Sequence, residues 1–443
     1  MMAVAEETDL YRASFERFAK GRSAEPAWLR ALRAAALARF SERGFPTTRD
    51  EDWRQTSVAP IARTAFRPAQ AGENGVVALK EEAFPSPRAV FLNGRFSPEL
   101  STPGSRLPAG VEVRSLRETL SRDAERLEPH LTRIASDSAN VFASLNAAFF
   151  EDGAVVFLAP GAVVEEPIQL VFLSASDSQP LVSYPRSLIV AGRGSQARIV
   201  ESYGGGEGQV YFTCAVTEVV VEDGAGIEHY RLQRESGSAF HVASLAVRQE
   251  RSSRFSNHQV SLGAALSRTD IDVRLGAEGG ECVLNGLFMA DGERHTDTHT
   301  RIDHAKPHCV SRELYKGIID GRGKGVFHGR IIVRKDAQKT DAYQTNKNLL
   351  LSKQALVDST PQLEIFADDV KCKHGSTTGQ LDPVALFYLR SRGIPEAAAR
   401  SLLTYAFASE LVKRITVAPV RAAIEEHLQA RLPGAPEIKE AVV

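Results

Sequence analysis

A cysteine and a histidine two positions apart, Cys372 and His374, have the types and spacing of paired metal or sulfur ligands. If DDVKCKHG is a β-strand, residues two apart point to the same face, so the thiol and the imidazole lie together. Lys371 and Lys373 then point to the other face, although their positive charge still favours the thiolate. Thiolate and imidazole both bind iron and zinc, but two ligands do not hold a metal tightly. The pattern therefore indicates either a site completed by residues from elsewhere or from a second subunit, or a buried thiol beside a surface histidine.

A second group of polar residues lies in RHTDTHTRIDHAKPHC, which holds four of the eleven histidines. On a strand, alternate residues share a face, so one face would carry His295, Asp297, His299, Arg301 and Asp303. The other face would carry Thr296, Thr298, Thr300 and Ile302, and a β-branched row of this kind packs well inside a β-structure. The charged row is then either a solvated strand face or an imidazole and carboxylate site for zinc or iron. The remaining candidates follow near a turn containing Pro307 and need not join the row: His304, His308 and Cys309.

Motifs for other chemistries are missing from the sequence. It contains no G-x-x-x-x-G-K-[ST], no H-E-x-x-H and no G-x-S-x-G. The stretch GRGKG at 321–325 lacks both the spacing and the hydroxyl of a phosphate-binding loop. The sequence therefore gives no support for an ordinary ATPase or hydrolase.

The elements that would position these residues begin near residue 151, where short runs rich in valine and isoleucine follow one another for about two hundred residues. Comparable turns start near Pro160, Gly192, Asp223, Glu250 and Ala277, at intervals of 27 to 32 residues. A spacing in this range is typical of solenoids. A parallel β-helix, in which each coil buries a face on the next, suits both this length and the lack of helices. A double sandwich or a barrel remains the alternative.

Helices are expected on both sides of this region. In the first 150 residues, Leu29, Ala36 and Phe40 share a helical face, and RAVFLNGRF predicts a hairpin with Asn93-Gly94 at its turn. After Gly375, three helices follow, of which the second repeats Leu403, Phe407 and Leu411. These last helices either cap the solenoid or bind a partner. We expect three domains, at 1–150, 151–374 and 375–443.

Composition narrows the class of protein further. Lys+Arg 54 against Asp+Glu 55 gives a net charge of −1, which does not favour nucleic acid or an acidic membrane as a partner. No apolar run approaches the ~20 residues of a membrane span, and the first residues do not resemble a signal peptide. The four cysteines form no close-spaced pair, as expected for reduced thiols in the cytoplasm.

Several of these stretches together resemble the SufB/SufD family of iron–sulfur cluster assembly scaffolds. The resemblance runs from LYKGIIDGRGKGVFHGRIIV through KTDAYQTNKNLLLS and STPQLEIFADDVKCKHGSTTGQLD to LDPVALFYLRSRGIPEAAARSLLTYAFASEL. Upstream, GFPTTRDEDWRQTS and VFLNGRFSPELS resemble the amino-terminal part of the SufD branch. The SufB branch has an amino-terminal C-x-x-C, whereas this sequence has no cysteine before Cys214.

The resemblance implies a mainly β fold, a right-handed parallel β-helix flanked by helical domains, and a scaffold subunit rather than an enzyme. It implies pairing with SufB through the β-helix and binding of the ATPase SufC through the C-terminal helices, with Leu403, Phe407 and Leu411 as candidate contacts. It also implies a transient iron–sulfur cluster at the SufB–SufD interface, with Cys372 and His374 as candidate ligands. The family's Cys-x-His matches these two positions.

Some questions stay open at the level of sequence. A flavin is associated with the family complex, but no flavin motif is readable here. Whether the chain alone forms a homodimer, which cluster type is built and what His295, His299, His304 and His308 do are equally open. The competing classes are a free-standing zinc protein using residues 295–309 and a β-helix enzyme acting on a polysaccharide.

Overall fold

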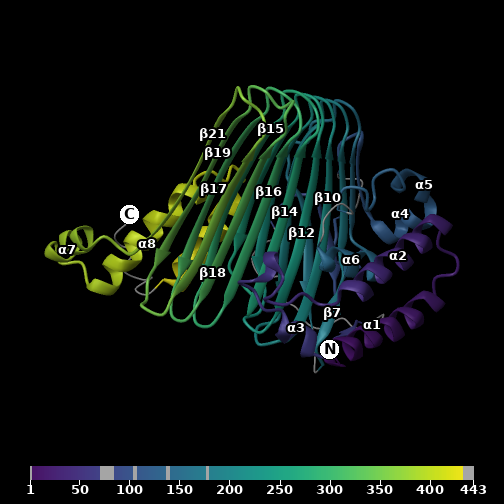
Figure 1. Ribbon diagram of the computed structural model, residues 1–443, viewed down its shortest axis with the longest axis horizontal. Helices are drawn as coiled ribbons and strands as arrows, with labels where there is room; N and C mark the ends of the chain where they lie inside the picture. Colours follow the sequence, from purple (N-terminus) through teal and green to yellow (C-terminus); the bar gives the residue numbers. More distant parts are fainter. Residues whose placement is uncertain (1, 70–83, 103–106, 136–139, 176–178, 433–443) are drawn as a thin grey trace.

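The computed structural model of the chain describes residues 2–69, 84–102, 107–135, 140–175 and 179–432. Its centre is a stack of β-coils in which the chain alternates between two sheets (Figure 1). We call these sheet A and sheet B. From β8 to β21 each coil contributes one strand to each sheet, so consecutive strands of this part of the sequence lie in opposite sheets.

Sheet A, followed from the last coil to the first, contains β20 (Leu356–Ile365), β18 (Lys324–Val333), β16 (His295–His304), β14 (Leu266–Leu275), β12 (Phe240–Gln249), β10 (Tyr211–Val221), β8 (Arg186–Ala191), β5 (Ala154–Leu158) and β4 (Val111–Ser115), with β7 (Leu181–Ser183) and β1 (Arg67–Pro68) beside this path. Sheet B, in the same direction, contains β21 (Lys371–Gly379), β19 (Asp341–Leu350), β17 (Val310–Ile319), β15 (Glu281–Ala290), β13 (Arg254–Ser261), β11 (Gly226–Arg234), β9 (Gln196–Gly205), β6 (Ile168–Ser174), β2 (Arg88–Leu92) and β3 (Arg95–Phe96).

The strand register identifies the architecture. From β5 to β20 in sheet A, and from β6 to β21 in sheet B, neighbouring strands are parallel and come from successive coils; His295 lies opposite Lys324, for example. Antiparallel pairs are found where β4 meets β5 and where β2 meets β3. The repeated turns therefore do mark successive coils, and the predicted parallel β-helix is confirmed.

Local sequence explains the coils. Their strands are rich in β-branched residues, which favour the pleated conformation. Glycines with left-handed backbone stand at corners, as at Gly194 and Gly224, with φ of 69° and 67°. Inside the coils, one buried cluster joins side chains of the two sheets, such as Val219 of sheet A and Ile227 of sheet B.

The N-terminal helices cover the outer face of sheet A at its first coils. In chain order the helical elements are α1 (Met2–Lys20), α2 (Ala27–Arg43), the 3-10 turn η1 (Glu51–Trp53), α3 (Ala59–Arg63), α4 (Leu116–Arg122), α5 (Ala124–Leu127) and α6 (Val141–Phe149). Leu29 and Phe40 of α2 are buried in a cluster that includes Phe212 of β10. The predicted helical face is confirmed, and so is the hairpin turn, in which Asn93 and Gly94 both have positive φ.

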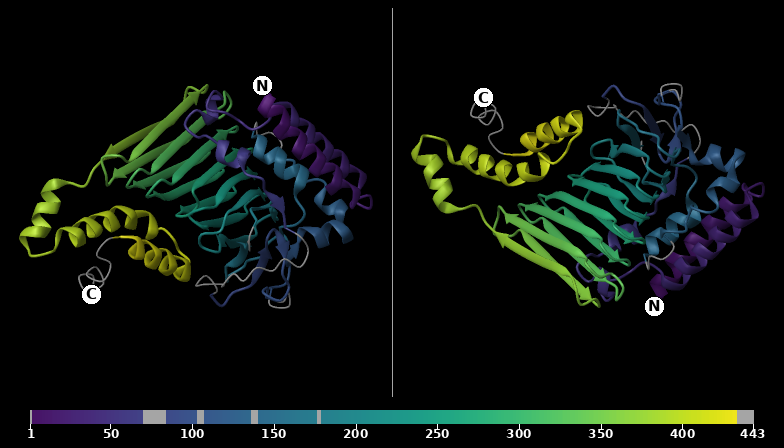
Figure 2. Two further views of the ribbon diagram at one scale, coloured as in Figure 1. Left: turned by 90° about the horizontal axis from the view of Figure 1, so that it is seen from below. Right: turned by 90° about the horizontal axis from the view of Figure 1, so that it is seen from above.

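The C-terminal helices are α7 (Pro383–Ser391), α8 (Glu396–Val412) and α9 (Ala418–Arg431). Figure 2 shows α8 and α9 lying along the β-helix, away from the N-terminal helices. They pack on the outer face of sheet B, where Leu411 and Ile424 share a buried cluster with Leu287. Burial of one such side chain contributes roughly 1.5–3 kcal/mol. In contrast, α7 contains no buried residue and lies at the end of the molecule (Figure 1).

Residues from the first 150 extend both sheets through β2, β3 and β4, and β21 runs to Gly379. The domain boundaries expected at residues 150 and 374 remain predictions. Among the described residues, none of the helices has both the length and the apolar character required to cross a membrane.

Candidate functional site

The thiol and imidazole of the Cys-x-His motif lie on the last strand of sheet B. Cys372 is in register with Ala342 of β19, and His374 with Gln344. Ala342 and Gln344 are buried inside the β-helix, so Cys372 and His374 share the face that continues this interior. The predicted strand is therefore present, with both side chains on one face. We call the end of the stack formed by β20 and β21 the open end. Cys372 is half-buried there, whereas His374 is exposed.

The electrostatic setting of Cys372 differs from the expectation that the flanking lysines favour a thiolate. Burial raises the pKa of the Cys372 thiol, and the nearby carboxylate of Asp341 raises it further. Lys373 turns to the other face, where its Nζ lies 5.6 Å from the centroid of the Tyr343 ring. Burial and the carboxylate therefore outweigh the lysines, and the thiol is the stable form until a metal or a partner displaces its proton.

A hydrogen-bonded group of polar side chains lies inside the β-helix next to this motif. The Oγ1 of Thr300 donates to Oε1 of Glu313 at 2.6 Å, and Nε2 of Gln344 donates to Oε2 of Glu313 at 2.7 Å. Because Gln344 is in register with His374, this chain of bonds ends directly below the imidazole. Burial raises the pKa of Glu313 to about 7, although the two hydrogen bonds favour the charged carboxylate and lower the pKa.

The open end also has the features of a surface for strand pairing. Within the described residues, β21 pairs with β19 on one side and β20 pairs with β18, and neither has a strand on its other side. Long unpaired edges of this kind are templates for pairing with another chain. Large apolar side chains stand nearby, since Leu356 and Phe366 are each 60% exposed. A second subunit could therefore both cover this end and bring further ligands to Cys372 and His374.

The C-terminal helix residues predicted to bind a partner have unequal exposure. Leu411 is 4% exposed and packs toward sheet B, and Phe407 is partly buried in the same cluster. The Nζ of Lys316 donates to the carbonyl oxygen of Phe407 at 2.8 Å, which fixes this part of α8 to the β-helix. Leu403 is half-buried. Their role in partner binding stays a prediction.

A more accessible apolar face occurs on α7, a helix of the predicted docking domain whose own residues were not named as contacts from the sequence. Val384 and Phe387 are each 72% exposed, and Tyr388 is 54% exposed. They stand at positions i, i+3 and i+4 of a helix whose start is fixed by Asp382, whose side chain accepts from the Val384 amide at 2.8 Å. The i, i+3 and i+4 spacing, which predicts one apolar face on this helix, was visible in the sequence.

The histidine-rich strand β16 shows the alternation expected from its sequence. Thr296, Thr298 and Thr300 are buried on the inner face, and His299 is half-buried on the outer face. His304, at the end of the strand, is fully buried, with Nε2 2.9 Å from Oγ of Ser311. The remaining candidates separate: His308 is exposed at a turn, and the Cys309 thiol is buried.

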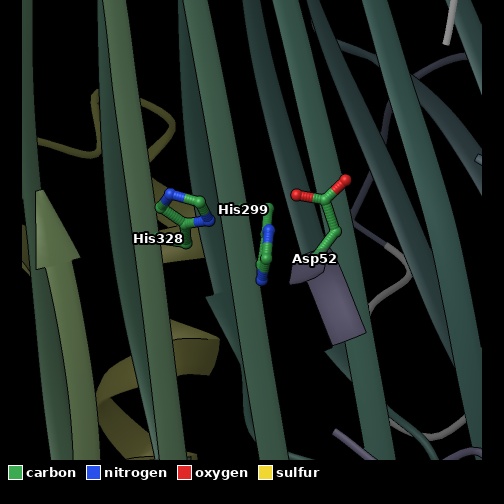
Figure 3. Close-up of side chains that lie close together, drawn as sticks. All are labelled: Asp52, His299 and His328. Carbon is green, nitrogen blue, oxygen red and sulfur yellow. The ribbon is translucent and has the colours of Figure 1, made fainter. Parts of the chain in front are cut away.

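The outer face of β16 is partly covered by the N-terminal segment, so it is not the solvated row considered above. Thr56 donates to Oδ2 of Asp297 at 2.6 Å and lies 2.8 Å from Nε2 of His295. Asp297 is fully buried, and although burial opposes ionisation, His299 and Arg268 hold its pKa well below the ordinary value. Figure 3 shows Asp52, from η1, beside His299 and His328. Neither Asp52 nor His328 was identified from the sequence.

The fold and the open-ended coil define a class of protein, and comparison with known proteins places the chain in it. Residues 172–407 match the model of the SufBD core domain of the SUF system for FeS cluster assembly, and residues 5–170 match that of the SufBD N-terminal region. The chain therefore belongs to the SufBD family of iron–sulfur cluster assembly proteins.

The chain is similar to curated members over most of its length. It is 35% identical to an iron–sulfur cluster assembly SufBD family protein of Synechocystis over 400 residues, covering 87% of each chain. It is 32% identical to the iron–sulfur cluster assembly protein SufD of Escherichia coli over 408 residues, covering 90% of this chain and 92% of that protein. Identity to SufB of Bacillus subtilis is 22% over 320 residues, covering 71% and 67%. The chain is thus SufD-like, and the resemblance seen in its motifs is confirmed.

Proposed function

We propose that this chain is a non-catalytic scaffold subunit of a cytoplasmic complex that builds nascent iron–sulfur clusters. In this proposal it pairs with a SufB-like subunit through the open end of its β-helix. The supporting observation is that the last coil carries Cys372 and His374 on the inward face and leaves both edge strands unpaired within the described residues. The partner would cover the end and supply the remaining ligands of a transient cluster, which is the cargo of the complex.

Shared ligation suits a cluster that must be passed on. A thiolate and an imidazole from one chain hold iron weakly until a second chain adds ligands. A change at the interface then opens or closes the site without unfolding either subunit. We propose that a SufC-like ABC ATPase drives this change by binding the C-terminal helices and hydrolysing ATP.

The proposal is tested with Cys372→Ala and His374→Ala in the complex co-expressed with the SufB-like and SufC-like subunits. Each variant should assemble normally, because His374 is exposed and Cys372 is only half-buried at the edge of the core, and each should cut the yield of assembled cluster severalfold. Cluster content is measured by iron and sulfide analysis and by visible absorption. Lys373→Ala, on the same strand but the opposite face, is the matched control and should keep the normal yield. Normal yield in both motif variants would sink the ligand role.

A further inference from the structure

The strongest unassigned group of side chains lies on the outer face of sheet A, far from the Cys-x-His motif in the sequence. We propose that Asp52, His299 and His328 bind a divalent first-row transition-metal ion such as Fe²⁺ or Zn²⁺. One ligand atom from each of the three lies within 4.8 Å of the others, and within the described residues no other group of three histidine, cysteine or acidic side chains comes so close. This inference is independent of the proposed role of Cys372 and His374.

The β-helix register places the two imidazoles together. His299 of β16 and His328 of β18 are directly opposite each other in parallel strands, which are spaced by about 4.8 Å. Their ring centroids are 4.9 Å apart with an interplanar angle of 76°. A ring nitrogen of His328 points toward His299 (Figure 3). The Nε2 atom of His328 is buried and has no hydrogen-bond partner among the described residues, so a nitrogen lone pair or proton there lacks a protein partner.

The carboxylate comes from a distant part of the chain that is firmly attached to sheet A. The guanidinium of Arg268 lies 3.7 Å from the centroid of the Trp53 ring, and its Nη1 donates to the carbonyl oxygen of Asp52 at 2.6 Å. Lys324 donates to the carbonyl oxygen of Gln55 at 2.8 Å. These contacts hold η1 over β16, so the Asp52 carboxylate stands beside the imidazoles although its side chain is exposed.

An outer layer of contacts orients one of the imidazoles. Nε2 of His299 lies 3.1 Å from Oδ1 of Asp297, which is fully buried and also pairs with Nη1 of Arg268 at 3.0 Å. A carboxylate behind a histidine fixes the ring and its tautomer in metal sites and makes the other nitrogen a better ligand. Because Nε2 of His299 faces the Asp297 carboxylate at 3.1 Å, Nδ1 of His299 is the atom that the metal would take.

The donor set points to the class of ion. Two imidazoles and one carboxylate are borderline nitrogen and oxygen donors, which suit Fe²⁺, Co²⁺ and Zn²⁺ rather than Ca²⁺ or Mg²⁺. Metal–ligand bonds of about 2.0–2.2 Å require the ligand atoms to lie roughly 3 Å apart. The three side chains must therefore move closer together when the ion binds. Asp52 can do so by changing its rotamer because it is exposed. Three protein ligands leave coordination positions for water or for a ligand delivered by another molecule.

The test uses untagged full-length protein and Co²⁺ as the probe, because its visible bands report on the ligands. Co²⁺ titration of the wild type should give bands of nitrogen and oxygen coordination without the intense charge-transfer absorption of a thiolate. His299→Gln, His328→Gln and Asp52→Ala should each raise Kd more than tenfold, since even loss of an outer-shell partner costs about 10–100-fold. Fe²⁺ under anaerobic conditions should compete with Co²⁺ for the site.

Matched controls separate this site from nonspecific binding and from the Cys-x-His motif. His308→Asn and Asp336→Ala change exposed residues elsewhere and should leave Kd unchanged. The double variant Cys372→Ala/His374→Ala should also bind Co²⁺ normally. Absence of binding by the wild type, unchanged Kd in either histidine variant, or loss of binding in the double variant would overturn the proposal. As a check that needs no variant, anomalous scattering from a Co²⁺-soaked wild-type crystal should peak among the three side chains, and a peak elsewhere would overturn it.

Discussion

Individual acidic residues inside the β-helix differ in their protonation because of their partners. Glu201 faces the imidazole of His229 at 2.8 Å, and although burial opposes ionisation, His229 and Arg231 hold its pKa at about 2. Glu313 is equally buried but has neutral partners, Thr300 and Gln344. Its pKa is therefore raised to about 7. A buried acid without a positive neighbour holds its proton to a higher pH, and Glu313 lies two strands from His374, in register with it through Gln344.

Glu313 should make folding stability depend on pH. Because its folded pKa is raised from 4.5 to about 7, its contribution is fully present below about pH 4.5 and is lost as pH rises through about 7. The loss is of order 3 kcal/mol. In Glu313→Gln this titration is absent, so the variant should gain stability relative to the wild type between pH 5 and 8. Denaturant unfolding at several pH values measures the difference, and Glu278→Gln, at an exposed position, is the control. Parallel pH curves for Glu313→Gln and the wild type would contradict this assignment.

At the scale of elements, the three C-terminal helices divide between packing and exposure. α8 and α9 bury one face on sheet B through residues such as Leu411 and Val420. α7 buries no residue, and its apolar side chains point away from the β-helix core. An exposed apolar helix face of this kind marks a contact with another molecule. Within the C-terminal helices that we propose to bind the ATPase, the contact therefore includes the apolar face of α7.

Charged substitutions on α7 should weaken binding of the ATPase subunit without destabilising the chain. Val384→Lys and Phe387→Lys should each raise the Kd at least about tenfold, because each places a charge in an apolar contact. Their unfolding midpoints should stay at the wild-type value, since both side chains are exposed. Val163→Lys is a matched control, because Val163 is 57% exposed on a different part of the molecule. Binding at wild-type affinity by both α7 variants would rule out this helix as a contact.

Sequence patterns predicted the elements better than the contacts between them. The threonines of β16 revealed its inner face, and the repeated turns revealed the coils, because both depend on residues close in sequence. His328 could have been found as well: it follows His299 by about one coil, and in-register strands bring such pairs together. Asp52 could not, since no periodic pattern connects η1 to β16. The exposure of α7 was equally hidden, because an apolar helix face looks the same in sequence whether it is covered or not.

For the whole molecule, the two ends of the β-helix are unequal. At the first coils the sheets end in the short antiparallel strands β3 and β4, and the N-terminal helices cover the outer face of sheet A, whereas the last coil presents the long strands β20 and β21 with apolar side chains around them. Natural β-proteins protect exposed edges unless these edges pair with something. The asymmetry favours assembly through the last coil, with either a SufB-like subunit or a second copy of this chain.

A charge at the open end should therefore weaken assembly. Phe366→Glu should reduce the fraction of chain that co-purifies with the SufB-like subunit severalfold, and should shift any self-association of the isolated chain toward the monomer. Sedimentation velocity measures the second effect. Val163→Glu changes a similarly exposed apolar residue away from this end and should have no effect on either. Equal assembly of the two variants would place the interface elsewhere.

The contacts of η1 also set an order of events during synthesis of the chain. Successive coils contact their neighbours in sequence, so each can be added as it leaves the ribosome. The bond from Arg268 to Asp52 spans 216 residues, and that from Thr56 to Asp297 spans 241. Therefore η1 and the residues after it cannot pack against sheet A until β14 and β16 have been synthesised. Asp52 is made long before Arg268 and Asp297, and its segment reaches its final position only after β14 and β16 have been made.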